Sequence, residues 1–329
     1  MPRIGLTGDV MLGRLVDERY RQPGHDAAAI WGNLHDRLRD LDGLLVNLEC
    51  AVSTRGRQWT RTRRPFHFRA TPDWATEALA TAGVDFACLA NNHLLDYEEP
   101  ALLDTLDHLD AVDVAHAGAA RTIAEAREPA LFTAGDIDVA VVAATDNTPE
   151  YAAGPDSPGV CHLDFDPTEE VTRTAVEGMV ADARARNPDL VVASVHGGPN
   201  METAPSDALR EFHRWLAERV DLVHGHSAHV FQGVEVVDGT PVLHDCGDFV
   251  DDYRVDQELR NDRGFLFVAE TDESGVRSLR LEPIEIRDRA VYAAERDVGV
   301  WCRETMRERS EPYRTHFHRD GDALVLNVA

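Results

Sequence analysis

Short apolar runs alternate with amphipathic stretches along most of this chain. Runs rich in Val, Leu and Ala predict buried strands at residues 3–6, 43–46, 86–90, 190–195 and 221–223. Helical periodicity predicts helices at residues 27–41, 72–82, 100–109, 168–186 and 206–219. This alternation is typical of an α/β architecture.

The pattern changes after residue 230. Asp238-Gly239 lies between two apolar runs and is a favoured hairpin turn, because both positions tolerate positive φ. Further elements are expected as strands at 264–270 and 276–286 and a helix near 300–311. We therefore expect an α/β fold with two mixed sheets packed face to face and helices outside. Residues 1–290 are expected to form one domain, and residues 291–329 a helical or extended tail packed on it.

Polar side chains follow the predicted strands at the point where each strand ends. The carboxylates, the amide and the imidazoles are those of Asp9, Glu49, Asn92, His196, His226 and His229. In α/β sheets, loops at the carboxyl ends of the strands converge on ligands, so we expect these side chains to meet. This mixture of oxygen and nitrogen ligands suits one or two divalent transition metal ions, such as Mn, Fe, Zn or Co. The sequence therefore predicts a hydrolytic metal site.

Each cluster also has a structural interpretation. Asp9 after a glycine could cap a turn, and Asn92 could cap a helix. A single strand-end histidine such as His196 is commonly a structural group. His226 and His229 are harder to explain by packing, because the two imidazoles lie three residues apart behind a glycine. This pair favours a metal site.

Composition narrows the class of protein. Hydrophobic residues make up 43% of the 329 residues, and no apolar run reaches the roughly 18 residues that a membrane span needs. No secretory signal is evident, so a cytoplasmic protein is expected. The five cysteines form no Cys-x-x-Cys pair and are expected to be buried core residues. Cys50 and Cys246 lie near the predicted site, and a ligand role is the alternative for them.

The net charge is −26, and all 33 basic residues are Arg. Such self-repulsion is tolerated where concentrated salt screens it, so we interpret the chain as halophilic. Codon usage that removed Lys, combined with ordinary surface acidity, is the alternative. Without Lys, no Schiff base or P-loop lysine can operate. The acidity also argues against nucleic acid as a partner.

One segment departs from this acidity. Residues 53–70 contain six Arg and neither Asp nor Glu. Arg61, Arg63, Arg64 and Arg69 are expected to bind an anionic small-molecule or polymer substrate, because guanidinium groups bind phosphate and carboxylate bidentately. An exposed loop that balances local acidic surface would have the same composition.

The motifs together resemble one known family. The matching segments are 8–14, 47–49, 68–70, 89–93 with Asp96, and 225–233. In this order they resemble the CapA, or poly-γ-glutamate capsule biosynthesis, family, which is similar to the calcineurin-like metallophosphatases. The resemblance implies a four-layer α/β/β/α sandwich with a dimetal centre on loops at strand ends.

The resemblance also implies a ligand set for two metals. The first-metal ligands would be Asp9 and His229, the bridge Glu49, and the second-metal ligands Asn92, His196 and His226. Phosphatases of that type have His where this chain has Met11, and Asp in place of Glu49. The first metal would therefore be short of one ligand.

The resemblance makes His93 the acid near the leaving group, with Asp96 as a second catalytic residue. Phosphoester hydrolysis by a metal-activated water is the function expected first. One alternative is a component of poly-γ-glutamate synthesis that acts on or binds the anionic polymer without phosphatase activity. Another is a binding module that has lost catalysis. The natural substrate, the number of ions and the oligomeric state are not predicted.

Overall fold

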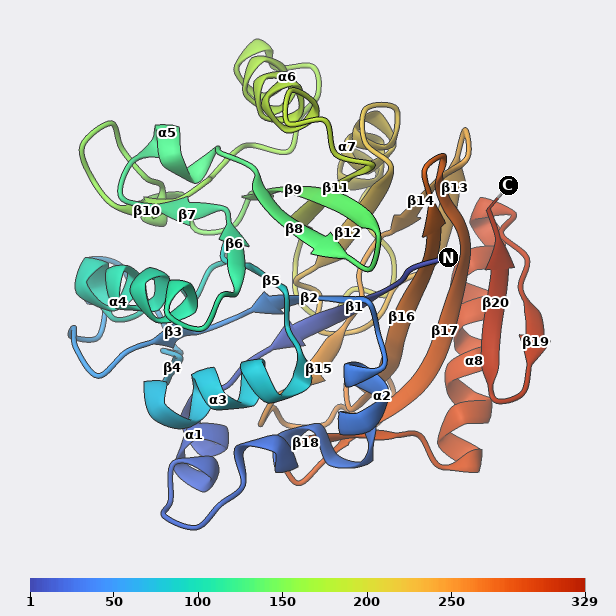
Figure 1. Ribbon diagram of the computed structural model, residues 1–329, viewed down its shortest axis with the longest axis horizontal. Helices are drawn as coiled ribbons and strands as arrows, with labels where there is room; N and C mark the ends of the chain where they lie inside the picture. Colours follow the sequence, from blue (N-terminus) through green and yellow to red (C-terminus); the bar gives the residue numbers. More distant parts are fainter. Residues whose placement is uncertain (329) are drawn as a thin grey trace.

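The computed structural model describes residues 1–328 and contains two large mixed β-sheets that lie face to face (Figure 1). The parallel strands of the first sheet are β1 (Arg3–Val10), β2 (Gly43–Leu48), β5 (Phe86–Cys88), β6 (Ala115–Ala117) and β15 (Asp248–Val250). Its antiparallel strands are β16 (Arg263–Asp272), β17 (Gly275–Arg287), β18 (Ala290–Ala293), β19 (His318–Asp320) and β20 (Ala323–Asn327).

The second sheet has a parallel centre and antiparallel edges. The central strands are β9 (Ile137–Thr145), β11 (Leu190–His196), β12 (Leu222–His226) and β14 (Thr240–Leu243). The edge strands are β8 (Ala130–Ala134) and β13 (Val234–Val237). Two small sheets pair β3 (Ala51–Val52) with β4 (Arg69–Ala70), and β7 (Ala119–Ala120) with β10 (Gly159–Val160).

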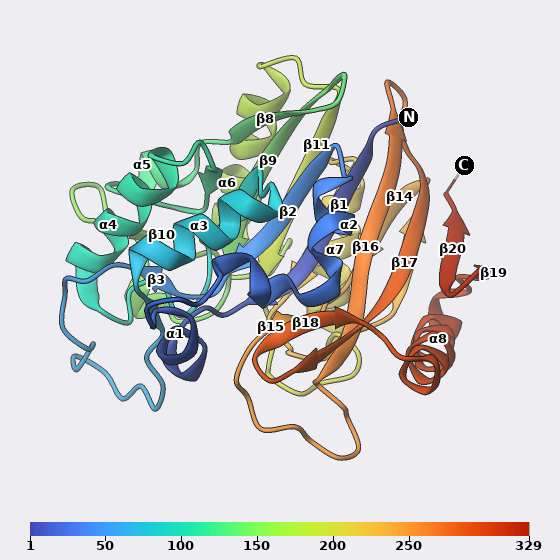
Figure 2. The same cartoon turned by 60° about the horizontal axis from the view of Figure 1, so that its bottom comes forward.

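Helices cover the outer face of each sheet (Figure 2). The first sheet carries α1 (Arg14–Tyr20), η1 (Ala27–Leu34), α2 (His35–Arg39), α3 (Pro72–Ala82) and α4 (Glu98–Asp110). The second sheet carries α5 (Ile123–Ala126), α6 (Glu170–Arg184) and α7 (Asp207–Ala217). The remaining helices are η2 (Pro149–Tyr151), α8 (Arg296–Ser310) and η3 (Glu311–Tyr313).

Strand periodicity explains why the layers stack in this way. Successive side chains of a strand point to opposite faces. In β2, Leu45 enters the core between the two sheets, whereas Leu44 and Val46 enter the core under the helices of the first sheet. In β9, Val141 likewise faces the core between the sheets, and Val142 faces α6 and α7. The predicted α/β/β/α sandwich is confirmed.

Two local predictions had different outcomes. Asp238 and Gly239 both have positive φ, 50° and 89°, between the paired strands β13 and β14, so the predicted hairpin is confirmed. The single helix predicted at 27–41 is wrong, because η1 and α2 replace it. Gly32 breaks the helix with φ 47°, and a Cβ there would lie 2.4 Å from the carbonyl oxygen of Val291. A tight tertiary contact overrides helical periodicity at this point.

The carboxyl-terminal segment contributes to the first sheet. Helix α8 begins before the predicted position near residue 300 and buries Cys302 and Met306 in the core between the sheets. Strand β20 pairs antiparallel with β17, and β19 follows at the sheet edge. Ala329, the last residue of the predicted tail, lies outside the described residues. Within residues 1–328, no helix is long and apolar enough to cross a membrane.

Candidate metal centre

Four of the predicted ligands lie at the ends of four strands in two sheets. Asp9 lies near the end of β1, and Glu49 directly follows β2 in the first sheet. His196 and His226 are the last residues of β11 and β12 in the second sheet. The paired registers place Asp9 opposite Asn47, and His196 opposite His226. All five residues are buried, so the two sheets bring their polar ends together inside the molecule.

One half of the site is rich in nitrogen. His196 Nδ1 lies 2.9 Å from His226 Nδ1, and His196 Nε2 lies 2.8 Å from Asn92 Oδ1. Nδ1 atoms of both histidines lie 3.9 Å from Asp9 Oδ1. Burial lowers the pKa of His196 to about 4 and the pKa of His226 well below its usual range. Both imidazoles are therefore neutral near pH 7 and can offer a lone pair to a cation.

The other half is rich in carboxylate oxygen. Asp9 Oδ2 lies 3.3 Å from His229 Nδ1, and the same nitrogen lies 2.9 Å from Asp248 Oδ1. Glu49 Oε1 lies 3.9 Å from His196 Nε2, so Glu49 reaches both halves. Two groups of potential ligands result, Asp9 with His196 and His226, and Asp9 with Glu49 and His229. Asp9 is common to both groups.

Buried oxygens of this site lack compensating hydrogen bonds. Among residues 1–328, Asp9 Oδ2 and Glu49 Oε1 have no hydrogen-bond partner, although a buried carboxylate normally requires one. Burial and the charge of Asp9 raise the pKa of Glu49 well above its usual range. Burial opposes ionisation of Asp9 as well, but the charge of the nearby His229 imidazole and a hydrogen bond from Asn47 to Asp9 Oδ1 outweigh it and lower its pKa. A divalent cation bound between these oxygens would supply the missing interaction and balance their negative charge, so the residues fit a metal ion.

His93 lies at the edge of the same site, and Asp96 contacts the ring nitrogen that is farther from the predicted ligands. Its Nδ1 lies 2.6 Å from Asp96 Oδ2, and Tyr151 donates a hydrogen bond of 2.9 Å to the other oxygen of Asp96. The ring of Phe68 stacks on the imidazole with centroids 3.7 Å apart. His93 Nε2 lies 4.0 Å from Glu49 Oε1 and therefore faces the carboxylate half. The structure thus fixes this ring with one nitrogen directed toward the predicted centre.

Of the four predicted substrate-binding arginines, Arg64 contacts a loop of the site. Its guanidinium donates to the backbone oxygen of Asn92 at 2.5 Å and to Thr148 Oγ1 at 2.8 Å. It also lies over the ring of Tyr151, 5.0 Å from the centroid. Because Asn92 in turn contacts His196, Arg64 is linked to the nitrogen-rich half through Asn92.

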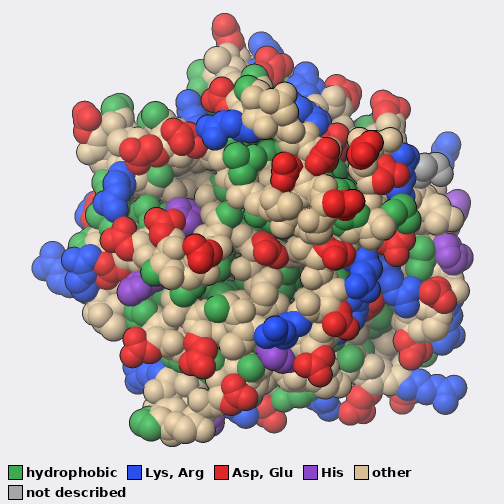
Figure 3. Space-filling model, in the orientation of Figure 1, with side chains coloured by type: hydrophobic (Ala, Val, Ile, Leu, Met, Phe, Trp, Pro, Cys, Tyr) green, Lys and Arg blue, Asp and Glu red, His purple; other side chains and the backbone are tan. Residues whose placement is uncertain are grey.

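The other three arginines are placed differently. Arg61 forms two hydrogen bonds of 2.8 and 2.9 Å with Glu99. Arg69 donates to the backbone oxygen of Arg55 and stacks over Tyr97 at 4.0 Å. Arg63 is exposed on the loop between β3 and β4. Side chains coloured as Lys or Arg protrude at the left edge of Figure 3, where Figure 1 places this loop.

The family follows from the sequence comparison. The chain matches the family described as "Bacterial capsule synthesis protein PGA_cap" over residues 3–253, which includes every predicted ligand. The chain belongs to the PGA_cap family. It is 30% identical over 351 aligned residues to the "Probable polyglutamine synthesis accessory protein" of Mycobacterium tuberculosis, covering 94% of this chain and 91% of that protein. It is 25% identical to the "PGA biosynthesis protein CapA" of Bacillus subtilis, covering 88% of this chain and 73% of that protein.

Solved structures extend the comparison to the fold. A hypothetical protein from Thermus thermophilus superposes with a TM-score of 0.51 at 16% identity, covering 86% of this chain and 99% of that one. The "Putative 5'-Nucleotidase" of Staphylococcus aureus, solved with alpha-ketoglutarate, superposes with a TM-score of 0.50 at 17% identity, covering 96% of this chain and 59% of that one. The PGA_cap chain therefore has a metallophosphatase-like fold, as the sequence motifs predicted.

Sequence reasoning missed two residues at the carboxylate half. Asp248 lies opposite Asp9 in the register of β15 with β1. Tyr253 Oη donates a hydrogen bond of 3.1 Å to Glu49 Oε2, and its ring packs against His229 with centroids 4.9 Å apart. Asp248 ends the polar run 244–248, which follows a predicted strand, and this position was an available signal. No comparable pattern indicates Tyr253.

The cysteines agree with the core interpretation. Cys50 and Cys246 are fully buried, and the five cysteines are free thiols. Burial raises the pKa of both thiols well above the usual range, which disfavours thiolate ligands. Neither cysteine belongs to the two ligand groups found among the described residues.

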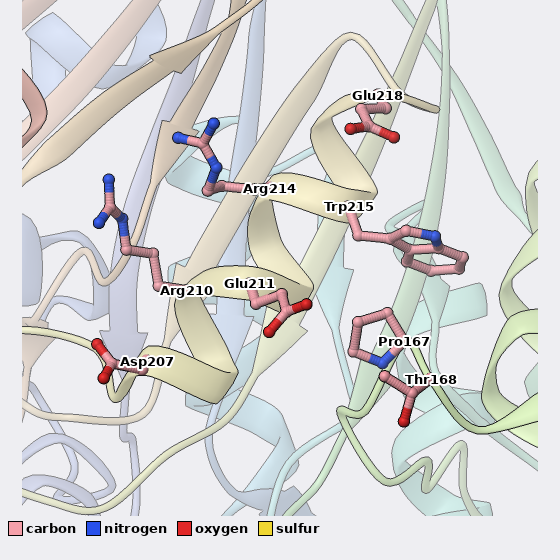
Figure 4. A pocket seen from close by; sticks show the side chains of 8 residues that line it. All are labelled: Pro167, Thr168, Asp207, Arg210, Glu211, Arg214, Trp215 and Glu218. Carbon is pink, nitrogen blue, oxygen red and sulfur yellow. The ribbon is translucent and has the colours of Figure 1, made fainter.

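A surface pocket of about 700 Å³ lies on α7, away from these residues (Figure 4). Figure 4 shows Trp215 pointing toward Pro167 and Thr168, with acidic and basic side chains alternating along the helix. Arg210 and Arg214 both pair with Glu235. Asp207, Glu211 and Glu218 also line the pocket, so it offers no excess positive charge for an anionic substrate.

Proposed function

We propose that this PGA_cap protein is a metal-dependent hydrolase that cleaves phosphoesters at a centre of one or two divalent ions. The observation that carries this proposal is the pair of buried ligand groups that share Asp9 and retain unpartnered oxygens on Asp9 and Glu49. The metallophosphatase-like fold supports the same class of reaction. The metal is Mn, Fe, Zn or Co, because each accepts mixed carboxylate and imidazole ligands.

The proposed ligands divide between the two halves of the site. One ion would be held by Asp9, Asn92, His196 and His226, and the other by Asp9, Glu49 and His229. In this proposal Asp9 is the shared ligand, in place of Glu49, which the family resemblance implied. When bound, such ions lower the pKa of a coordinated water to about 7 and neutralise charge that develops on the phosphoryl oxygens. Proton transfer to the leaving group and binding of the substrate are assigned to protein side chains around the ions.

His93 is proposed to transfer a proton to the leaving oxygen. Its Nδ1 is held by Asp96, so Nε2 is the nitrogen that can exchange a proton with the substrate. Phe68 stacks on the ring and limits its rotation. Burial lowers the pKa of His93, and Asp96 opposes this effect by stabilising the charged form of the imidazole while it sets the ring's orientation. Proton donation of this kind contributes most when the leaving group is a poor one.

Arg64 is proposed to bind the anionic group of the substrate beside the nitrogen-rich half. Its guanidinium already lies at the Asn92 backbone, and a forked donor suits phosphate or carboxylate oxygens. Arg61, Arg63 and Arg69 are proposed to contact more distant anionic groups of a longer substrate along the same loop. The partner is accordingly an anionic small molecule or polymer.

The second candidate function is binding or processing of poly-γ-glutamate without phosphatase activity. Membership of PGA_cap and the names of the Mycobacterium and Bacillus relatives favour it. The same arginines would then contact polymer carboxylates, and the metal would bind the polymer or stabilise the fold. Location in the cytoplasm stays a prediction under either function.

One experiment separates these functions. The purified protein is loaded with each metal, its metal content is measured by elemental analysis, and activity is assayed on para-nitrophenyl phosphate esters and on polyglutamate. We expect metal-dependent release of para-nitrophenol, with at least about 100-fold loss in Asp9→Asn. His213→Gln is the control, because His213 is buried outside both ligand groups. Polymer binding without ester hydrolysis would favour the second function.

A further inference from the structure

The carboxylate-rich half contains one acidic side chain that the ligand set above does not use. Asp248 begins β15, which runs parallel to β1 with Asp248 opposite Asp9. The backbone N–H of Asp9 donates to the Gly247 oxygen at 2.8 Å, so the two strands are in register at this point. Paired residues of neighbouring parallel strands point their side chains to the same face. The side chain of Asp248 therefore points, like that of Asp9, toward the proposed metal centre.

Asp9 Oδ2, His229 Nδ1 and Asp248 Oδ1 are three potential ligand atoms, and the distances between them are those expected around one metal ion. His229 Nδ1 lies 3.3 Å from Asp9 Oδ2 and 2.9 Å from Asp248 Oδ1. Metal–ligand bonds of about 2.0 to 2.2 Å place neighbouring ligand atoms roughly 3 Å apart around one ion. These separations match that requirement without rearrangement of the backbone.

The second oxygen of Asp248 needs a partner. Asp248 is 1% exposed, and within the described chain its Oδ2 accepts no hydrogen bond. Asp9 and Glu49 each carry a buried unpartnered oxygen as well, so three carboxylates surround His229. Such a concentration of buried negative charge is costly unless a cation compensates it.

Met11 has its sulfur engaged away from this role. It is fully buried, and its sulfur accepts a hydrogen bond of 3.1 Å from the Gly13 N–H, so the thioether is directed at the backbone of its own turn. We propose that Asp248 is the additional protein ligand of the ion held by Asp9, Glu49 and His229. This inference rests on the metal centre of the proposed function and adds a residue to it.

A positioning role is the competing explanation. Asp248 could simply accept the His229 hydrogen bond and orient the ring. Asp248→Asn separates the two explanations, because an amide oxygen accepts the same hydrogen bond but is a weaker metal ligand than a carboxylate. Orientation alone therefore predicts unchanged ion affinity in Asp248→Asn, whereas a ligand role predicts weaker binding of one of two ions.

The test is equilibrium dialysis of Mn²⁺ against the chelator-treated full chain, followed by elemental analysis, with no substrate present. We expect two ions per wild-type chain, with one of them bound at least about 100-fold more weakly in Asp248→Asn, beyond the loss typical of an orienting residue, and lost in Asp248→Ala. Asp17→Asn is the control, since Asp17 is a buried carboxylate outside both ligand groups that accepts hydrogen bonds from Thr71 and Trp74, and its substitution should leave both ions bound.

The outcomes distinguish this inference from the proposed function. Two tightly bound ions in both Asp248 variants, or equal losses in Asp17→Asn, overturn the role of Asp248 and leave the hydrolase proposal intact. A wild-type chain that binds no Mn²⁺ overturns both. Loss of one ion in the Asp248 variants, in a protein that hydrolyses no ester, supports the ligand role and overturns the hydrolase proposal alone.

Discussion

His196 Nδ1 lies 2.9 Å from His226 Nδ1, and the two imidazoles meet because β11 and β12 pair in parallel with these residues in register. Two neutral imidazoles at this distance can share one proton or bind one cation. Burial lowers the pKa of His196 to about 4 and the pKa of His226 well below its usual range. A shared divalent ion is the arrangement that uses both nitrogens together with Asp9.

Adding Mn²⁺ or Zn²⁺ to the chelator-treated protein should therefore stabilise the fold. Binding to the native state alone contributes about 2.7 kcal/mol at an ion concentration 100 times Kd. Thermal unfolding should show a higher Tm with metal, and the increase should be smaller in His226→Ala. In His213→Gln the increase should persist, because that histidine contacts His244 and neither ligand group. An identical metal response in His226→Ala would contradict the ligand assignment.

Replacing His93 should affect substrates according to their leaving groups. His93→Asn removes the proton that Nε2 would deliver, and general acid catalysis contributes about 10² to 10⁴-fold. We expect a large loss of kcat on alkyl phosphates and a smaller loss on para-nitrophenyl phosphate, whose leaving group needs little protonation. Asp96→Asn should show the same trend more weakly, because Asp96 acts through His93. Equal losses on both substrates would assign His93 a structural role.

Two arginines in one loop should differ in their effect on substrate binding. Arg64→Gln removes a guanidinium that contacts the Asn92 backbone, and a lost charge-assisted hydrogen bond of about 1.5 to 3 kcal/mol corresponds to a KM increase of roughly tenfold or more. Arg61→Gln removes one that is paired with Glu99, and KM for a small phosphate ester should change little. Steady-state kinetics on both variants measures the difference. If Arg64→Gln leaves KM unchanged for every anionic substrate, the proposed contact is wrong.

Much of the architecture could be predicted because it follows local patterns. The Leu44-Leu45-Val46 run of β2 is apolar on both faces, as a strand between two packed layers must be. The Asp238-Gly239 turn fixed a hairpin by backbone preference alone. The helix predicted at 27–41 breaks at Gly32 because of the close approach of Val291, which lies far along the chain and leaves no local signal.

The site was only partly predictable for the same reason. Strand-end polar clusters indicated Asp9, His196 and their companions, since parallel strands collect such residues at one edge. Asp248 depends on the register of a three-residue strand, β15, with β1, and no local periodicity specifies that register. The composition of the arginine-rich loop likewise could not distinguish Arg64, at the site, from Arg61, which is paired with Glu99.

The acidic surface gives a prediction about salt. Asp and Glu side chains are spread over the face shown in Figure 3, and the net charge of −26 makes their repulsion the expected source of instability in dilute buffer. The free energy of unfolding should rise as KCl increases from about 0.1 to 1 M, over which the Debye length falls from about 10 to 3 Å. Urea unfolding at each salt concentration measures it. Equal stability across the series would contradict the halophilic interpretation.

Glu235 supplies a prediction about pH that is independent of metal. Burial alone would raise its pKa, but hydrogen bonds from His244 and Arg210 outweigh burial and lower the pKa to about 2. A carboxyl group with a lowered folded-state pKa stabilises the protein above its unfolded value near 4.5, and this stabilisation disappears as the pH falls from 4.5 through 2. Glu235→Gln should therefore cost about 2 kcal/mol at pH 7 and less below pH 4.

The control for this prediction is Glu282→Gln. Glu282 pairs with Arg37 and Arg280 near the surface, where ion pairs contribute about 0 to 1 kcal/mol. Chemical unfolding of both variants and the wild type at pH 7 and at pH 3.5 gives the change in the free energy of unfolding for each variant at each pH. If the cost of Glu235→Gln is the same at both pH values, the ionised carboxylate is not the source of the stabilisation. The contacts of Glu235 with His244 and Arg210 would then act through packing alone.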